Sequence, residues 1–287
     1  MRTISLRKIL ITLFLFGVYL IVSSLWGFYW GIHPPHKLVS TIDPSFFGIK
    51  YEEVEFKTTD NLRIRGWFIP SKYPKAKTLI LLHGYPADKG NILPALYYLN
   101  NKYHLLFIDF RSFGESAGAY TTIGKEEVLD LLAAIDFLKT RGIDSVGVYG
   151  FSMGGAVAMM AAAKSPAIKA IVADSSYARL DLMLREYYSI PLAKYLLAEF
   201  TRLWSWIFLA TDPKEVSPLD AIKQLKIPIL IIHSKNDNII PFSQAILLKD
   251  AAKNNPNVSY IFLEKNLHGD TVNATQQMVE RFFDSNL

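Results

Sequence analysis

Cysteine is absent from this chain of 287 residues. Its absence excludes disulfide bonds, a thiol nucleophile, thiolate metal sites and a lipid attached through an N-terminal cysteine. A chain without thiols is also compatible with an oxidising compartment. The chemistry of the chain therefore has to be sought in other side chains.

Charged side chains are missing from residues 9–32. As a helix this run of about 24 residues would measure roughly 36 Å, enough to cross a bilayer core of about 30 Å. Arg2, Arg7 and Lys8 precede the run, whereas only Lys37 follows it closely. The positive-inside rule therefore predicts a cytoplasmic N-terminus and an extracytoplasmic position for everything after the helix.

A cleaved signal peptide is the alternative to an uncleaved membrane anchor. Residues 22–24 offer small side chains for cleavage, but the apolar run continues beyond them. Trp26, Phe28, Tyr29 and Trp30 gather at the exit end, where amphipathic rings prefer the headgroup layer. We expect an uncleaved anchor, because the run is long and the cleavage site is poor.

The rest of the chain has little excess charge. Three of the 31 basic side chains precede the helix, so the rest of the chain has 28 basic and 26 acidic side chains. A net charge this close to zero does not predict a nucleic-acid-binding protein. A segment of this length fits one large α/β domain. We expect a cytoplasmic segment at residues 1–8, an anchor at 9–32, a connector at 33–50 and one domain at 51–287.

Short apolar runs alternate with segments of helical length after residue 77. The runs cover residues 78–83, 104–110, 145–149, 168–173, 227–233 and 258–263. Runs of this kind, buried on both faces, indicate a mostly parallel sheet with helices on either side. Before them, residues 51–68 predict two strands with one wet face each, around a turn at 59–61. Helical spacing predicts helices at 125–140 and 271–283.

The segment 178–216 interrupts this alternation. It is rich in tyrosine, tryptophan and phenylalanine and predicts helices rather than strands. We interpret it as a lid inserted over the ends of the sheet. Aromatic side chains more often fill a core, so we expect some of these rings to pack inside and others to line a pocket.

Ser152 is the candidate nucleophile. Residues 150–154 read G-x-S-x-G, between the apolar run 145–149 and an alanine-rich helical stretch at 155–164. A serine on such a strand-to-helix turn adopts a strained conformation that exposes its hydroxyl, while the flanking glycines allow strand and helix to approach. The N–H of Met153 then lies at a helix N-terminus, where an oxyanion would form.

His268 is the candidate general base. Of the six histidines, His33 and His36 flank the apolar run, and His83, His104 and His233 lie at strand ends. His268 alone occupies a loop between the last predicted strand and the last predicted helix. A histidine at the carboxyl edge of a parallel sheet is well placed to face the nucleophile.

Asp237 is the candidate acid that orients the histidine. It follows the run 227–233 and gives the chain order serine, aspartate, histidine that this topology requires. Asp174, at the end of the run 168–173, is its rival at the same edge. Asp270 lies two residues from His268 and is more simply interpreted as a helix cap.

The second oxyanion donor is expected in the loop that begins at His83. Gly84 permits a tight bend, and Tyr85 has a backbone N–H to donate, which Pro86 lacks. We therefore expect the N–H groups of Tyr85 and Met153 to form the oxyanion hole.

These motifs resemble the α/β-hydrolase superfamily, in particular its serine-aminopeptidase-like branch and the membrane-anchored members of that branch. The resemblance covers roughly residues 51–285. It implies the family fold, a triad of serine, histidine and aspartate, and an acyl-enzyme mechanism without cofactor or metal. The matching stretches are His83 and Gly84, residues 109–116, residues 150–155, Ser217 and Pro218, Asp237 and His268.

Two positions depart from the family pattern, which often has glycine at Ser112 and at Ser234. Neither would supply a triad atom, so these departures concern loop geometry. We interpret Asp109 and Arg111 as a structural pair that ties the first of these loops down.

The resulting hypothesis is a membrane-anchored serine hydrolase that cleaves an ester, thioester or amide. The aromatic lid and the nearby bilayer favour a small-molecule or lipid-like acyl substrate. An acyltransferase using the same triad, a non-catalytic binding protein and a peptidase acting on short peptides are the alternatives. The peptidase would need Glu186 or Glu199 to hold a free amine, although carboxylates on a helix usually form its solvated face.

Overall fold

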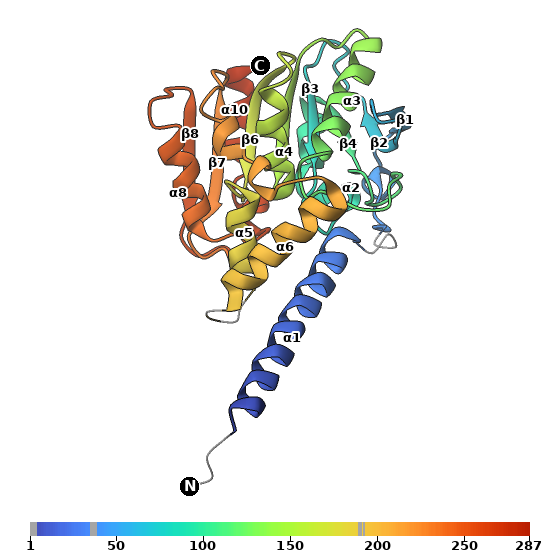
Figure 1. The fold of residues 1–287 in the computed structure, drawn as a ribbon. Coiled ribbons are helices and arrows are strands. Elements are labelled where there is room, and N and C mark those ends of the chain that lie inside the picture. Colours follow the sequence, from blue (N-terminus) through green and yellow to red (C-terminus); the bar gives the residue numbers. More distant parts are fainter. Residues whose placement is uncertain (1–4, 35–38, 189–190, 192) are drawn as a thin grey trace.

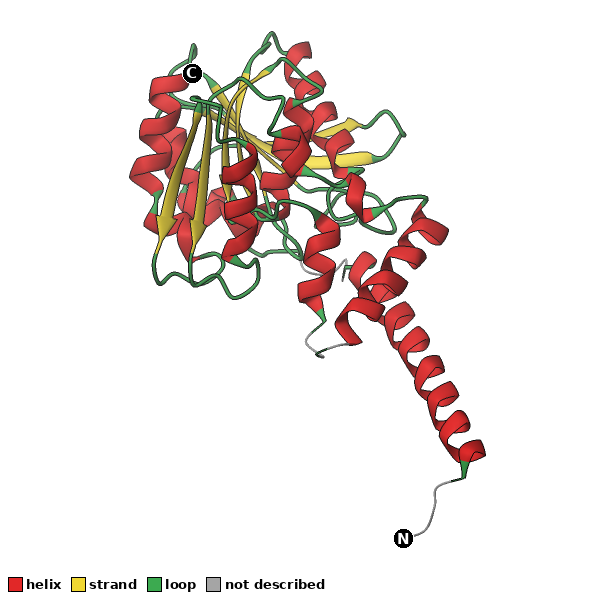
Figure 2. Cartoon of the chain, turned by 60° about the vertical axis from the view of Figure 1, so that its left-hand side comes forward, coloured by secondary structure: helices red, strands yellow, loops and turns green. Residues whose placement is uncertain are grey.

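A computed structural model describes residues 5–34, 39–188, 191 and 193–287. Helix α1 (Leu6–Ile32) projects away from a body in which helices surround a twisted sheet (Figures 1 and 2). The predicted start of the anchor falls within α1, although residues 1–4 lie outside the described part. By length and composition α1 is able to cross a membrane, and most of its side chains are exposed.

The sheet has eight strands in the order β1-β2-β4-β3-β5-β6-β7-β8. The strands β3 to β8 run parallel, and β2 is antiparallel to both β1 and β4. This confirms the predicted mostly parallel sheet. The bounds are β1 Glu52–Lys57, β2 Arg63–Ile69, β3 Thr78–Leu82, β4 His104–Ile108, β5 Val146–Phe151, β6 Ile168–Asp174, β7 Ile229–Ser234 and β8 Val258–Leu263.

Both faces of the sheet are covered because its central strands are apolar on both sides. In β3, Ile80 and Leu82 pack into the core on one face, whereas Leu79 and Leu81 pack into the core on the other. The first core includes α3 (Glu127–Thr140), α4 (Met153–Ala162), α7 (Pro218–Ala221) and α8 (Phe242–Ala251). The second includes α2 (Lys89–Leu96), α9 (Asp270–Ala274) and α10 (Gln276–Asn286). Three short 3-10 helices, η1 (Pro44–Phe47), η2 (Tyr97–Asn101) and η3 (Pro213–Glu215), complete the described elements.

The segment interpreted as a lid contains α5 (Leu180–Tyr187) and α6 (Ala193–Leu209). The parallel strands point toward the end of the body at which these helices and α1 lie, as the arrows in Figure 2 show. Helix α6 packs along α1. Helix α1 and the segment interpreted as a lid therefore lie at the same end of the body, beyond the carboxyl edge of the sheet (Figure 2).

The expected final helix at 271–283 is two helices. Thr275 leaves the helical conformation, with φ −116° and ψ 7°, and separates α9 from α10. Its hydroxyl and its N–H both donate to the carbonyl of Thr271, at 2.9 and 3.1 Å. Asp270 is not a cap either, because Gly269 occupies the cap position and the Asp270 carboxylate accepts the N–H of Leu267 instead.

Candidate active site

Ser152 lies on the turn between β5 and α4 in a strained conformation. Its φ is 53° and its ψ is −115°, a region that costs a non-glycine residue on the order of 1–3 kcal/mol. Its N–H donates to the carbonyl of Asp174 in the neighbouring strand at 2.7 Å, which helps to hold the turn. A Cβ on Gly150 would lie 2.3 Å from the carbonyl carbon of Gly154, so this crossing of strand and helix requires glycine. The flanking glycines therefore have the role predicted for them.

The side chain of Ser152 faces a cavity of about 530 Å³. Only 6% of the residue is exposed, and its hydroxyl is reached through this cavity. Most of the lining is apolar, with Leu180, Met183 and Leu209 among the side chains. A nucleophile at the wall of an apolar cavity suits a substrate with an apolar portion.

His268 and Asp237 form a hydrogen-bonded pair at the carboxyl edge of the sheet. His268 Nδ1 lies 2.8 Å from Asp237 Oδ2. The Asp237 side chain is fully buried, whereas the His268 side chain keeps some solvent contact. Because a carboxylate only accepts, His268 Nδ1 carries the proton and Nε2 is left as the acceptor in the neutral ring. This is the tautomer that a general base needs.

The loop around Asp237 stabilises its charge. Burial by itself would raise the pKa of Asp237, but the hydrogen bond from His268 and the N–H groups of Ile239 and Ile240 outweigh burial and hold that pKa below its usual value. Those N–H groups donate to Asp237 Oδ1 at 2.9 and 2.8 Å. His233 also holds this loop in place, because its Nε2 donates to the carbonyl of Ile240 at 2.9 Å.

Ser152 and His268 lie at the same edge of the sheet without direct bonding. Within the described ranges of the chain, no hydrogen bond joins the Ser152 hydroxyl to the His268 ring. The rings of His268 and Phe151, the residue before the serine, lie 4.8 Å apart between centroids. Hydrogen bonds of this kind are often long in the free enzyme and tighten when substrate binds. Asn238 also contacts His268, because its Oδ1 accepts the His268 N–H at 3.2 Å.

The rival acid does not contact the histidine through a hydrogen bond in the part of the chain that the structure describes. Asp174 accepts hydrogen bonds from Tyr149 at 2.7 Å and from Ser175 at 3.1 Å. Burial raises its pKa to about 6. Of the two carboxylates weighed from the sequence, Asp237 is therefore the one that contacts His268.

The loop that begins at His83, in which an oxyanion donor is predicted, contacts Ser152. A Cβ on Gly84 would lie 2.9 Å from the Cβ of Ser152, so only glycine permits this approach. In the described parts of the chain, the backbone N–H groups of Tyr85 and Met153 have no hydrogen-bond partner. Tyr85, Met153 and Ser152 line the same cavity. Two unpaired donors beside a hydroxyl are the arrangement that an oxyanion hole requires.

His83 orients the loop that carries the Tyr85 N–H. His83 Nε2 accepts the N–H of Phe110 at 3.0 Å, so Nδ1 bears the proton and donates to the carbonyl of Gly84 at 2.7 Å. That carbonyl belongs to the same peptide unit as the Tyr85 N–H and points in the opposite direction. Burial lowers the pKa of His83, which keeps the ring neutral and preserves this pattern. The sequence predicted that this loop begins at His83, but it did not predict that the His83 ring would hold the loop in place.

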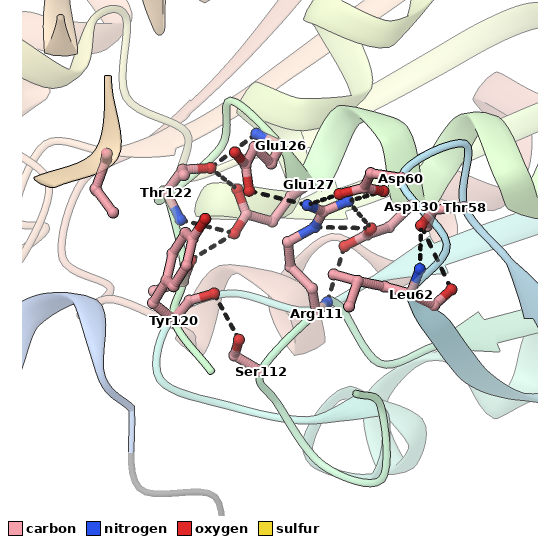
Figure 3. A network of polar contacts seen from close by, with 12 residues as sticks. Thr58, Asp60, Leu62, Arg111, Ser112, Tyr120, Thr122, Glu126, Glu127 and Asp130 are labelled. Carbon is pink, nitrogen blue, oxygen red and sulfur yellow. Dashed lines mark hydrogen bonds and ion pairs between the residues drawn. The ribbon is translucent and has the colours of Figure 1, made fainter. Parts of the chain in front are cut away.

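Asp109 and Arg111 do not pair with each other, contrary to the expectation. Asp109 pairs with Lys89, whose Nζ lies 2.6 Å from Oδ2. Arg111 is buried and binds a separate set of carboxylates, as Figure 3 shows. These partners are Asp60, Glu126 and Asp130. Each residue still ties down the loop after β4, so the predicted role is right and the predicted partner is wrong.

One of the two departures from the family pattern lies in a backbone conformation that favours glycine. Ser112 has a φ of 66°, in the left-handed region that favours glycine. Its hydroxyl donates to the carbonyl of Tyr120 at 2.5 Å, which offsets part of the strain (Figure 3). Ser234 ends β7 and its hydroxyl accepts the N–H of Asn236 at 3.1 Å.

The sequence analysis missed that α1 contributes to the cavity. Gly27, Phe28, Gly31 and Ile32 line it together with Ser152. Glycines four residues apart on an apolar helix are a signal of close helix approach, and this signal was present. The contact itself joins segments far apart in the sequence, so the sequence alone could not place it at the serine.

Comparison with known proteins agrees with this geometry. The model of the alpha/beta hydrolase fold family matches residues 77–202. A relative in Bacillus subtilis, YqkD, is 31% identical over 69% of this chain and 67% of its own length. The chain belongs to the alpha/beta hydrolase family. This confirms the resemblance drawn from the motifs.

Two further relatives cover most of the chain. The protein YfhR of Escherichia coli K12 is 29% identical over 95% of this chain and 93% of its own length. Among solved structures, the Pyrococcus furiosus esterase Pf2001 superposes with a TM-score of 0.74 at 28% identity, covering 89% of this chain and 99% of the esterase. The shared fold therefore extends over nearly the whole of the chain after α1.

Proposed function

We propose that this protein is a membrane-anchored serine hydrolase that cleaves an ester, thioester or amide of an apolar acyl group. Ser152, His268 and Asp237 act as nucleophile, general base and orienting acid. The hydrogen bond of 2.8 Å between His268 and Asp237, beside a serine on a strained turn, is the observation that carries the proposal. Membership of the hydrolase family and likeness to an esterase support it.

The reaction would proceed in two halves. His268 Nε2 takes the proton of Ser152 as its hydroxyl oxygen attacks the acyl carbonyl, and the Tyr85 and Met153 N–H groups stabilise the oxyanion. The leaving group departs with the proton from His268. Water then attacks the acyl-enzyme with His268 again as base, which releases the acid and restores Ser152. Asp237 stabilises the transient imidazolium throughout.

A fluorophosphonate probe tests the nucleophile directly, because it labels only an activated serine. The full chain in detergent should be labelled, and Ser152→Ala should not. Ser175→Ala is the matched control, since this serine is also buried near the sheet edge but bonds to Asp174 and Thr271. Absence of labelling in the folded wild type would support a non-catalytic protein instead.

The anchor is proposed to be uncleaved, with its N-terminus in the cytoplasm and the catalytic domain on the far side. The length of α1 and the basic residues Arg7 and Lys8 at its start support this topology. Reporter fusions at the C-terminus provide the test. A reporter active only in the cytoplasm would reverse the orientation, and a mature protein lacking α1 would favour a signal peptide.

A peptidase acting on short peptides is a second candidate because one acidic side chain lines the cavity. Glu186 faces it and could hold a free amine, although its carboxylate also lies 3.8 Å from Lys194. Glu199 is mostly exposed and pairs with Arg202 at 3.3 Å. Hydrolysis of aminoacyl anilides that fails in Glu186→Gln, with esters still cleaved, would favour this candidate. Acyl transfer uses the same triad, and product analysis with competing alcohols distinguishes it from hydrolysis.

A further inference from the structure

The anchor helix forms one wall of the cavity that contains Ser152. Gly27, Phe28, Gly31 and Ile32, in its last two turns, all line the cavity. Tyr188 and Leu209 of the lid segment line the same cavity. A helix needed only as a tether would have no reason to reach the nucleophile's cavity.

Specific contacts hold α1 against the lid segment. Trp204 donates to the hydroxyl of Ser24 at 3.0 Å, and the rings of Phe28 and Phe208 stack with centroids 6.0 Å apart. A Cβ on Gly27 would lie 3.4 Å from the hydroxyl of Tyr188, so the glycine lets the lid segment come close. The wall is therefore a packed part of the structure.

The length of α1 places this wall at the membrane surface. Its 27 residues measure about 40 Å, whereas about 20 residues, or 30 Å, cross the hydrocarbon core. With Arg7 and Lys8 at one interface, the last turns of the helix reach the opposite headgroup layer. Trp26 and Trp30 are exposed on these same turns, as expected for rings at a membrane interface.

The lid helix presents further apolar side chains beside this wall. Leu203, Trp206, Ile207 and Phe208 of α6 are all exposed, and α6 packs against α1. Figure 1 shows the two helices side by side at the same end of the body. The bilayer interface would cover this exposed apolar surface, because the surface is continuous with the membrane helix.

We propose that the substrate is an acyl ester of a membrane lipid, which enters the cavity from the bilayer beside the last turns of α1. This inference rests on the proposed hydrolase function and names its substrate class. The ester carbonyl of a bilayer lipid lies where hydrocarbon meets headgroup, the level that the last turns of α1 occupy. The acyl chain fills the apolar cavity, and Ser152 attacks the carbonyl. The alcohol portion of the lipid leaves with the proton from His268, and water releases the fatty acid.

Gly31→Phe tests this entry route. Gly31 lines the cavity, and a Cβ added there meets no atom within 4 Å, so the backbone at this position accepts a side chain. Gly17→Phe is the matched control, because a Cβ at Gly17 also meets nothing within 4 Å and this residue is outside the cavity lining. Both variants are made in the full chain and reconstituted in phosphatidylcholine vesicles.

Long-chain and short-chain substrates separate binding of the acyl chain from the chemistry at Ser152. With p-nitrophenyl palmitate and with a fluorogenic phospholipid in the vesicles, Gly31→Phe should lose about tenfold or more in kcat/KM, since several methylene groups lose their place in the cavity. With p-nitrophenyl butyrate and with a fluorophosphonate probe, which place less chain in the cavity, its loss should be at least several-fold smaller. Gly17→Phe should match the wild type in all four assays.

The outcomes separate this inference from the proposed function. A wild type that neither hydrolyses the butyrate ester nor takes the probe would overturn the function itself. Equal losses on short and long chains, or no loss on either, would overturn the entry route while leaving the hydrolase intact. Release of acyl groups from an S-acylated peptide but never from vesicle lipids would overturn the lipid as substrate.

Discussion

The indole N–H of Trp204 in α6 donates a hydrogen bond of 3.0 Å to the hydroxyl of Ser24 in α1. The same hydroxyl donates to the carbonyl of Ile21 at 2.8 Å, and Ser24 is fully buried. An unpaired polar group in such surroundings is costly, so this bond fixes the lid helix to the anchor helix. The position of the cavity wall depends on it.

Trp204→Phe should therefore destabilise the full chain in detergent by about 1–2 kcal/mol, because it removes the donor and some packing. Trp206→Phe, on the same helix but mostly exposed, should change the melting temperature little. Thermal unfolding followed by intrinsic fluorescence or circular dichroism measures both. Equal losses for the two variants would show that the bond to Ser24 contributes nothing specific.

Asp237→Asn should lower kcat for a short ester by roughly three to four orders of magnitude. The amide cannot stabilise the imidazolium, and it favours the wrong tautomer of His268. Asp174→Asn is the control, because Asp174 bonds to Tyr149 and Ser175 and should leave kcat within about tenfold of the wild type. A larger loss at Asp174 than at Asp237 would reverse the assignment of the acid.

Much of the sheet could be predicted because fully buried parallel strands are short, apolar and rich in β-branched residues. Ser152 could be predicted because its turn requires glycine at fixed spacings. The ionic partners of Asp109 and Arg111 could not be predicted, because pairing among several carboxylates depends on how the loops fold. The division of the last helix at Thr275 is a local change of backbone conformation, which periodicity does not reveal. The contact of α1 with the cavity depends on packing between distant segments.

His83 is expected to act as a positioning residue for the oxyanion loop. His83→Ala removes the donor to the Gly84 carbonyl, so the Tyr85 N–H loses its fixed direction. We expect kcat to fall by about 10²–10³ with KM little changed, because an oxyanion donor acts mainly in the transition state. His104→Ala at the start of β4, which loses only a bond from the Ser71 N–H, should leave kcat near the wild-type value. A rise in KM at constant kcat would contradict the positioning role of His83.

Asp174 should make the stability of the protein depend on pH. Burial raises its pKa from the usual 3.8 to about 6, so between these values the folded protein holds a proton that the unfolded chain has released. The contribution of this group to stability therefore falls as the pH rises through that window, by about 1.4 kcal/mol per pH unit and by at most about 3 kcal/mol in all. In the Asp174→Asn variant this side chain does not titrate, so it makes no such contribution to the pH dependence of stability.

The free energy of unfolding of Asp174→Asn, relative to that of the wild type, should therefore be larger at pH 7 than at pH 4, which means that the variant gains stability relative to the wild type as the pH rises. Thermal or denaturant unfolding of both chains in the same detergent measures this difference across the window, and taking the difference cancels the titration of all other groups that behave alike in the two proteins. A constant difference would mean that Asp174 has the same pKa in the folded and the unfolded protein. In that case the hydrogen bonds from Tyr149 and Ser175 would compensate fully for burial, and the carboxylate would be ionised at neutral pH without cost.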